Sequence, residues 1–312
     1  MFRLANALIP LRFSRDCNAI EDLGLMKPIR TMPDDREIEL RPLKSHDDFR
    51  SAMGLEKAIW GLSDEDVLPL TFIIASQAAG AAWHGAFDGN SLIGFAFGFL
   101  GWEGGEAVMH SHMLAVLPQY RDLDVGRRLK MVQRADALEI GIRKITWTFD
   151  PLQGKNAHLN FSKLGVVSSK YKVNFYGPET SSLLHRNGTD RLWVEWQLDS
   201  SRVAQRLQGE DNRAEIIDAV RNTMPLVRFD GSGRPTRGNL GDALARQKIA
   251  IEIPSDINSI EKADAGLSSE WREITRWGFL QALHHGFTVQ EFCRSVRGEQ
   301  GPGAYLLDRN PQ

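Results

Sequence analysis

Hydrophobic and polar positions along this chain follow two different periods, and the period changes repeatedly. Short runs rich in β-branched and aromatic residues predict strands, and apolar residues three or four positions apart predict helices. The predicted strands are 37–43, 82–87, 91–100, 109–116, 142–149, 192–198, 249–253 and 304–307. The predicted helices are 45–60, 69–79, 125–141, 212–221 and 267–285, and 287–292 fits either a strand or a helix end. Together these elements predict an α/β protein of layered α+β type.

Capping and turn residues support several of these boundaries. Ser45, followed by Asp47 and Asp48, is typical of a helix start. The turn Asp88-Gly89-Asn90 between two apolar strands predicts a hairpin. Residues 200–248 are polar and Gly-rich around 230–233, which predicts a helix followed by a long surface connection.

The most informative stretch is 113–125, MLAVLPQYRDLDV, followed by Gly126-Arg127-Arg128-Leu129. An apolar strand runs into a turn with a proline, and a basic residue and a glycine then lead into an amphipathic helix. The first backbone N–H groups of a helix have no partner inside it, and they lie at the positive end of the helix dipole. With arginines nearby, such a junction suits a pyrophosphate. The sequence therefore predicts a phosphate-bearing cofactor here.

Composition narrows the class of protein. Among 312 residues, 38 Lys and Arg nearly balance 40 Asp and Glu, so charge gives no reason to expect nucleic acid or an anionic membrane as partner. Two cysteines, Cys17 and Cys293, argue against a disulfide framework and a cysteine metal site. The longest apolar run, 68–83, is interrupted by Ser76 and Gln77 and predicts a helix packed on a sheet, not a membrane span. We expect a cytoplasmic enzyme, monomeric or homodimeric, without a metal.

The first 35 residues form a separate segment. Residues 1–13 carry two arginines around a short apolar stretch, with no small-residue cleavage pattern after it, so a secretory signal is not expected. Residues 27–35 lack periodicity, and Met26 lies just before them. We interpret 1–35 as a flexible or loosely docked extension, or as the product of an upstream start codon.

Two motifs resemble the GNAT superfamily of acyl-CoA-dependent N-acyltransferases. Residues 121–126 are similar to its cofactor loop, R/Q-x-x-G-x-G/A, with Asp124 in place of the first glycine. Asp tolerates left-handed backbone angles, so the loop can keep its shape with this side chain turned outward. In 156–166, the residues Asn156, Ala157, Lys163 and Gly165 are in register with N-A-x-x-x-Y-x-K-x-G-F. The strings SHMLAV, ITWTFDPL, LNFSKLG and NFYG also resemble a branch of predicted acyltransferases.

The resemblance implies a domain organisation. Its core is a GNAT-like mixed, mostly antiparallel central sheet flanked by helices, with a C-terminal αβ extension. The extension is either a degenerate half-GNAT, as the string Ala282-Leu283-His284-His285-Gly286-Phe287 suggests, or an unrelated αβ unit that completes the sheet. The predicted parts are a flexible extension at 1–35, an acyltransferase domain at 36–200, a linker with a helix at 201–248 and the C-terminal extension at 249–312.

The resemblance also implies an acyl-CoA site, for acetyl-CoA or another acyl-CoA. A backbone N–H near Met113 and Leu114 would meet the thioester carbonyl, the pantetheine arm would pair with 114–116, and the pyrophosphate would meet 121–126. Arg127 and Arg128 either neutralise phosphate or form a solvated helix face. The predicted cosubstrate-binding residues are Met113, Leu114, Val116, Arg121, Asp122, Leu123, Asp124, Val125, Gly126, Arg127, Asn156 and Lys163.

Candidates for the catalytic base are His110, His112 and Asp150. The two histidines alternate onto one strand face, where they either look into the acceptor cleft or are packed away. A metal site formed by the two histidines would lack a third ligand. We favour His112 as the base, because an imidazole titrates in the useful range, whereas Asp150 either binds an ammonium group or belongs to a turn before Pro151.

The general acid is an open question, because Phe161 stands where the superfamily often has a tyrosine. The thiolate leaves unaided, or Tyr171 or Tyr176 protonates it, or the protein is inactive. We predict catalytic roles for His112, Asp150 and Tyr171.

The function that these residues favour is direct transfer of an acyl group from acyl-CoA to a small amine or amino acid within a ternary complex. A catalytically silent protein that binds acyl-CoA or a partner, and a protein N-acetyltransferase, are the alternatives. The sequence specifies neither the acyl group nor the acceptor.

Overall fold

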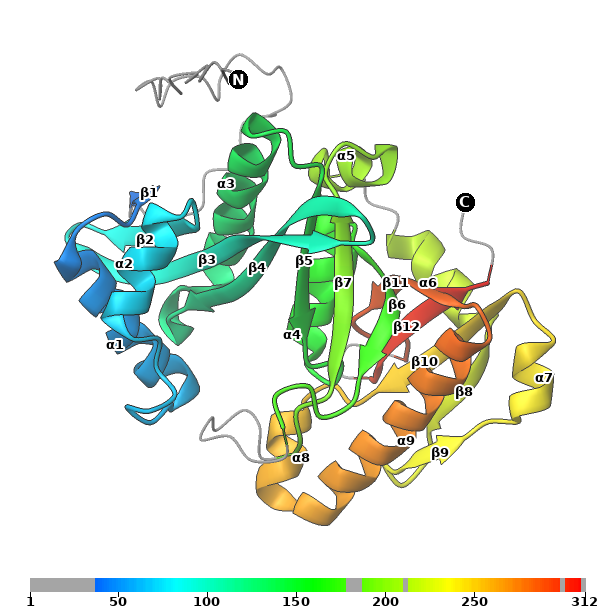
Figure 1. Cartoon of the computed structure of the whole chain (residues 1–312). Helices are drawn as coiled ribbons and strands as arrows, with labels where there is room; N and C mark the ends of the chain where they lie inside the picture. Colours follow the sequence, from blue (N-terminus) through cyan, green and yellow to red (C-terminus); the bar gives the residue numbers. More distant parts are fainter. Residues whose placement is uncertain (1–36, 178–186, 210–212, 298–300, 310–312) are drawn as a thin grey trace, which may run out of the picture. The chain divides into compact units, whose positions relative to one another are not determined.

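A sheet of twelve strands, in the order β1-β2-β3-β4-β5-β7-β6-β11-β12-β10-β8-β9, organises the described part of the protein (Figure 1). β4 pairs with β5, and β8 with β10, in parallel, and the other neighbours are antiparallel. The strands are β1 Ile38–Pro42, β2 Ala82–Asp88, β3 Ser91–Glu103, β4 Glu106–Val116, β5 Lys144–Phe149, β6 Val167–Lys172, β7 Arg191–Gln197, β8 Met224–Phe229, β9 Pro235–Arg237, β10 Lys248–Ile253, β11 Thr288–Cys293 and β12 Gly303–Asp308.

The structure, a computed structural model, describes residues 37–177, 187–209, 213–297 and 301–309, all within one unit, Asp34–Gln312. The predicted extension 1–35 lies outside the described residues. The helices are α1 His46–Trp60, α2 Leu70–Ala78, the 3₁₀ helix η2 Pro118–Leu123, α3 Val125–Glu139, α4 Gly154–Ala157, the π-helix η3 His158–Leu164, α5 Ser201–Leu207, α6 Arg213–Arg221, α7 Leu240–Leu244, α8 Ile257–Ala263 and α9 Ala265–His284. No helix among the described residues is long and apolar enough to cross a membrane.

Helices cover the two faces of β2–β4 differently. On one face, α1 and α2 pack against large rings, and Trp83 stacks on Phe97 with ring centroids 4.0 Å apart. On the other face, α3 packs Leu129 against small residues such as Ala86 and Ala96, which allows the helix to approach the sheet closely. Because the two faces alternate along each strand, bulky and small residues alternate too.

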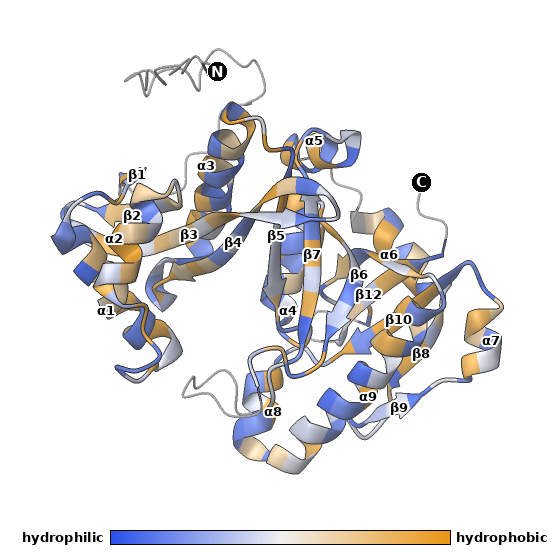
Figure 2. Ribbon diagram, viewed as in Figure 1, coloured by the Kyte–Doolittle hydropathy of each residue, from blue (hydrophilic) through white to orange (hydrophobic). Residues whose placement is uncertain are grey.

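The C-terminal strands share a hydrophobic core with the strands before them. Trp147 and Trp196 belong to the same cluster as Phe279 of α9 and Tyr305 of β12. Hydrophobic and hydrophilic residues interchange along α9 in Figure 2, as expected for a helix with one buried side. The sheet is continuous at this point through a single residue pair, Ser168 of β6 with Val289 of β11.

The predicted fold class is confirmed: the sheet is mixed and mostly antiparallel, helices flank it, and an αβ extension follows. Ser45 begins α1 with a capping box, in which its hydroxyl accepts from the N–H of Asp48 at 3.0 Å and the Asp48 carboxylate accepts from the N–H of Ser45 at 3.1 Å. Segment 287–292 is a strand, and the apolar run 68–83 is divided between α2 and β2.

One expectation differs from the structure. The polar segment after 200, expected to contain one helix and a long surface connection, also forms α5, α7, β8 and β9. In β8 only Leu226 and Val227 are fully buried, and β8 is held by parallel pairing with β10. Two buried residues are too few to produce a recognisable period in the sequence. The domain boundaries themselves stay a prediction.

Candidate active site

The strands β4 and β5 are neighbours over only two residue pairs, Met109 with Ile145 and His110 with Thr146. Beyond His110, this edge of β4 has no strand beside it among the described residues, while the other edge stays paired with β3 as far as Val116. An unpaired strand edge offers backbone donors and acceptors to an extended ligand. We call the region beside residues 111–116 of β4 the opening.

His112 lies at a β-bulge beside the opening. Phe97 of β3 pairs with Met113 and Gly98 pairs with Ser111, so His112 is the additional residue on β4. The rings of His110 and His112 have centroids 6.3 Å apart, and Phe99 lies 5.4 Å and 6.0 Å from them. The two imidazoles therefore share one face, as the sequence predicts.

Burial keeps both imidazoles uncharged at neutral pH. Burial, aided by His112 and Lys130, lowers the pKa of His110 to about 4, and burial lowers the pKa of His112. Nδ1 of His110 lies 3.1 Å from the Thr146 hydroxyl. Within the described residues, by contrast, no group hydrogen-bonds the His112 ring. A neutral imidazole without a protein partner can accept a proton from a substrate.

The chain reaches α3 through a left-handed residue at Asp124, with φ 58° and ψ 13°. This is the backbone conformation that the glycine of the resembling motif would supply, and Asp adopts it more readily than most residues. The Asp124 carboxylate makes no cap to α3 and instead accepts from Nε of Arg127 at 2.7 Å. The first N–H groups of α3 are thus left without a side-chain cap from Asp124, as an anion site requires.

Gly126 places the start of α3 over the opening. A Cβ at this position would lie 3.8 Å from Leu114, 3.9 Å from Leu159 and 4.0 Å from Val116. Because glycine has no Cβ, the backbone of α3 is exposed toward the end of β4 and toward η3. The chemistry of these groups fits an acyl-CoA: backbone N–H groups for phosphates at 124–127, and an open strand edge at 113–116 for an amide-containing arm.

The other predicted cosubstrate residues surround this point with different partners. Arg121, Asp122 and Leu123 lie in η2, and Nε of Arg121 donates to the carbonyl of Val116 at 3.1 Å. Arg128 donates to the carbonyl of Ile38 at 2.7 Å and is directed toward β1. Val125, the first residue of α3, is fully buried against the sheet, and both Asn156 of α4 and Lys163 of η3 are exposed.

Asp150 is not a free carboxylate. Its two oxygens accept from the two Nη atoms of Arg272 in α9, each at 2.7 Å. Although burial raises it, the charge and hydrogen bonds of Arg272 leave the pKa of Asp150 below its ordinary value. An acceptor ammonium could bind Asp150 only by competing with this guanidinium.

Tyr171 lies on the opposite face of the sheet from His112. It pairs with Leu192 of the core, whereas the neighbouring Trp193 packs on His110 with centroids 4.9 Å apart. The Tyr171 hydroxyl donates to Asp190 at 2.7 Å, and burial together with the Asp190 charge raises its pKa well above the ordinary value. The structure does not bring Tyr171 and His112 together.

Tyr176, the other tyrosine considered, lies on the face of the histidines. Its hydroxyl is 3.4 Å from the hydroxyl of Thr148. Thr148 is two residues beyond Thr146, which pairs with His110, so the Tyr176 hydroxyl lies beside β5, the strand that flanks the opening. Phe161 is fully buried against Phe149 and Tyr305 and does not reach the opening.

Lys130 of α3 is a charged residue that sequence reasoning missed. Its amino group is buried, donates to the Ser111 hydroxyl at 2.7 Å and lies 3.7 Å from the centre of the Trp147 ring. Burial lowers its pKa to about 7. A lysine among apolar helix positions normally extends to solvent, so no sequence signal marked this one.

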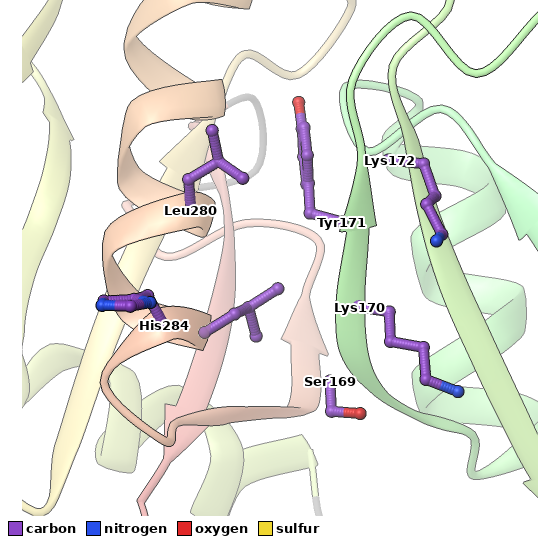
Figure 3. Close-up of a pocket in the computed structure, with 7 residues that line it drawn as sticks. Ser169, Lys170, Tyr171, Lys172, Leu280 and His284 are labelled. Carbon is purple, nitrogen blue, oxygen red and sulfur yellow. The ribbon is translucent and has the colours of Figure 1, made fainter. Parts of the chain in front are cut away.

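A hollow of about 360 Å³ lies elsewhere, between β6 and α9 (Figure 3). Tyr171 and Leu280 stand in it, and the amino groups of Lys170 and Lys172 point away from α9. Neither histidine of β4 lines it. Among the described residues there is no group of three His, Cys, Asp or Glu side chains suited to a metal ion.

Comparison with known proteins gives a family match that includes the opening. Residues 47–165 match the model of a family described as the acetyltransferase (GNAT) family. A ribosomal-protein-S18-alanine N-acetyltransferase from Escherichia coli is 14% identical, with 53% of this chain and 96% of that chain covered and a TM-score of 0.42. An N-acetyltransferase from Staphylococcus aureus Mu50 is 15% identical, with 52% and 99% covered and a TM-score of 0.43.

A third similar structure is yncA from Salmonella typhimurium, solved with its cofactor acetyl-CoA. It is 15% identical, with 53% of this chain and 95% of that chain covered and a TM-score of 0.41. At such low identities and TM-scores, the three structures add no argument to the family match. No curated protein matches this chain.

Proposed function

Since residues 47–165 belong to the acetyltransferase (GNAT) family and the chain is therefore an acyl-CoA-dependent acetyltransferase, we propose that it acylates a small amine or amino acid. The observation that carries this proposal is the opening itself. An unpaired strand edge, the start of α3, which Asp124 does not cap with its side chain, and a neutral histidine lie there. These are the groups that hold an extended phosphate-bearing cosubstrate and take a proton from an amine.

We assign the cosubstrate to the backbone. The N–H groups at the start of α3 hold phosphate, residues 113–116 pair with the extended arm, and an N–H near Met113 or Leu114 polarises the acyl carbonyl. Acyl-CoA supplies an activated acyl group when bound. A Cβ at Gly126 would contact the side chains of Leu114 and Val116, so the glycine lets the start of α3 lie close to the end of β4.

We assign the proton transfers to the side chains of His112 and Tyr176. The acceptor nitrogen loses a proton when it is acylated, and His112 holds that proton because its imidazole is neutral and has no hydrogen-bond partner among the described residues. In this proposal the Tyr176 hydroxyl, which lies beside Thr148 of β5, donates a proton to the leaving thiolate. We propose Tyr176 for this role in preference to Tyr171, which lies on the other face and donates to Asp190. Asp150 serves in this proposal as the anchor of Arg272.

The test has two stages. Acetyl-CoA and CoA should raise the melting temperature of the full chain, and pantetheine, which lacks the phosphates, should do so much less. Replacing Gly126 with Trp should abolish the response, whereas the control change Ala135→Trp, at an exposed position further along α3, should not prevent it. Equal stabilisation of Gly126→Trp and parent by CoA would reject this site.

The second stage measures release of free thiol from acetyl-CoA with a panel of amines, amino acids and short peptides. Turnover with small amines or amino acids supports the proposal. Stabilisation by CoA without turnover of any acceptor would indicate a silent binder, and turnover of peptides alone would indicate a protein N-acetyltransferase.

A further inference from the structure

A row of rings extends across the sheet from His112. The rings belong to β3, β4, β7 and the turn after β6, and each contacts the next. The centroid distances are 6.0 Å from His112 to Phe99, 5.4 Å from Phe99 to His110, 4.9 Å from His110 to Trp193, 6.1 Å from Trp193 to Phe175 and 4.8 Å from Phe175 to Tyr176. We call these six residues the aromatic row.

Much of the aromatic row is open to solvent. Phe97, under α1 and α2, is 1% exposed, but Phe99, two residues further along the same face of β3, is 37% exposed. Phe175 and Tyr176 are each 39% exposed. The opposite face of this part of the sheet is covered, as the stacking of Tyr171 on Phe279 of α9 illustrates. The cover of the first two helices thus ends where the row begins.

Exposed rings of this number are costly to leave in water, because each carries a large apolar area. The His110 imidazole at the centre of the row is neutral, since its pKa is about 4. Charged side chains lie close to it: the Thr146 hydroxyl, 3.1 Å from Nδ1 of His110, donates to Glu103 at 3.3 Å, and Lys170 pairs with Glu195. The exposed rings favour a flat ring over a sugar or an aliphatic chain.

We propose that the acceptor is a primary amine that carries an aromatic ring. This inference rests on the proposed function, because it uses His112 as the site of the acceptor nitrogen. The ring of the acceptor lies over His110, between Phe99 and Trp193, and its short chain brings the nitrogen to His112, whose ring is 6.3 Å from that of His110. A free arylalkylamine and an aromatic amino acid share this chemistry, and they differ in the carboxylate beside the amine.

The experiment compares acceptors with the full chain and saturating acetyl-CoA. We expect kcat/KM for 2-phenylethylamine to exceed that for n-hexylamine by about tenfold or more, because ring–ring contacts add to the burial of apolar area. Phenylalanine at least as good as 2-phenylethylamine would identify the amino acid as the source. Spermidine, an aliphatic polyamine without a ring, should be a poorer acceptor than 2-phenylethylamine.

Variants of the row separate binding from folding. Trp193→Leu and Phe99→Leu should raise KM for 2-phenylethylamine about tenfold, raise KM for n-hexylamine much less, and leave the CoA-induced thermal shift unchanged. Trp102→Leu is the matched control, since Trp102 is the most exposed large apolar residue of the same β3–β4 hairpin, at 73%, and no ring of the row contacts it.

Calorimetric titration of 2-phenylethylamine distinguishes this inference from the proposed function. Saturable binding that Trp193→Leu weakens supports the inference even if no acetyl-CoA is turned over. If the protein binds CoA but prefers n-hexylamine or spermidine as acceptor, the inference is wrong and the proposed acyltransferase function is unaffected. The same holds if the variants of the row do not change KM for 2-phenylethylamine. Self-association that Phe175→Leu abolishes, with no binding of the amine, would assign the row to a second copy of the chain and would also overturn it.

Discussion

The amino group of Lys130 donates a hydrogen bond of 2.7 Å to the hydroxyl of Ser111, the first residue of β4 beyond its pairing with β5. The Ser111 hydroxyl in turn donates to Oε1 of Gln133 at 2.7 Å. A buried chain of polar side chains from α3 therefore holds β4 at the point where the opening begins. Because Lys130 has a pKa of about 7, this chain changes charge near neutral pH.

Lys130→Met should make stability less dependent on pH. The folded-state pKa of Lys130 is below its unfolded value of 10.5, so the unfolded chain binds more protons between about pH 7 and pH 10.5 and stability rises with pH in that window. This pH-dependent part of the stability decreases as the pH falls from 10.5 and is fully lost once the pH has fallen through about 7. The variant should gain up to a few kcal/mol over the parent at pH 6, and the difference should shrink by pH 9. Urea unfolding at both values checks this, with Lys163→Met as exposed control; a constant difference would contradict it.

Asp150→Asn should destabilise the protein by about 3–5 kcal/mol, because it leaves the buried guanidinium of Arg272 without its counter-charge. Replacing both partners, Asp150→Leu with Arg272→Met, should recover a large part of the loss. Asp199→Asn, which breaks an exposed pair with Arg143, should cost about 1 kcal/mol or less. Denaturant unfolding measures all three. A stable Asp150→Asn variant with a raised KM for the acceptor would instead support ammonium binding by Asp150.

His112→Ala should lower turnover about a hundredfold, as loss of general base assistance does, with the CoA-induced thermal shift retained. Since burial lowers the pKa of His112, the parent should keep its activity to a lower pH than an exposed histidine would allow. A pH profile of kcat/KM for parent and variant tests both statements. Full activity of His112→Ala between pH 6 and pH 9 would make His112 a packing residue.

Tyr176→Phe should lower kcat about tenfold without changing KM for acetyl-CoA, if its hydroxyl protonates the leaving thiolate. Tyr171→Phe is the matched control: it removes a hydrogen bond to Asp190 and should cost about 1–3 kcal/mol of stability at unchanged kcat. Phe161→Tyr should destabilise the fold, because Phe161 is fully buried and packs edge to face on Tyr305. If Tyr171→Phe lowers kcat and Tyr176→Phe does not, Tyr171 is the general acid.

Asp124→Gly should leave the affinity for CoA unchanged or improve it. Glycine keeps the left-handed angle at this position, and the change removes a carboxylate near the phosphates and releases Arg127 from its 2.7 Å ion pair. Calorimetric titration of CoA into parent and variant measures the effect. Weaker binding with an intact fold would show that the Asp124–Arg127 pair organises the loop.

The amino-acid sequence by itself determined the local features of this protein. The start of α1 at Ser45, the hairpin at Asp88–Asn90 and the left-handed turn at Asp124 each depend on residues within a few positions of one another. The common face of His110 and His112 follows from the strand period in the same way. Propensity, capping and side-chain period act over one or two turns of chain, so these features can be read without the fold.

Only the tertiary structure decided which side chains meet across the chain. Asp150 and Arg272 are 122 positions apart, and no local pattern in either segment marks them as partners. The burial of Lys130, the separation of Tyr171 from Tyr176 onto two faces and the aromatic row all depend on the order of strands in the sheet and on where its helices end. Strand order and helix packing result from the balance of burial over the whole core, which no short window of sequence contains.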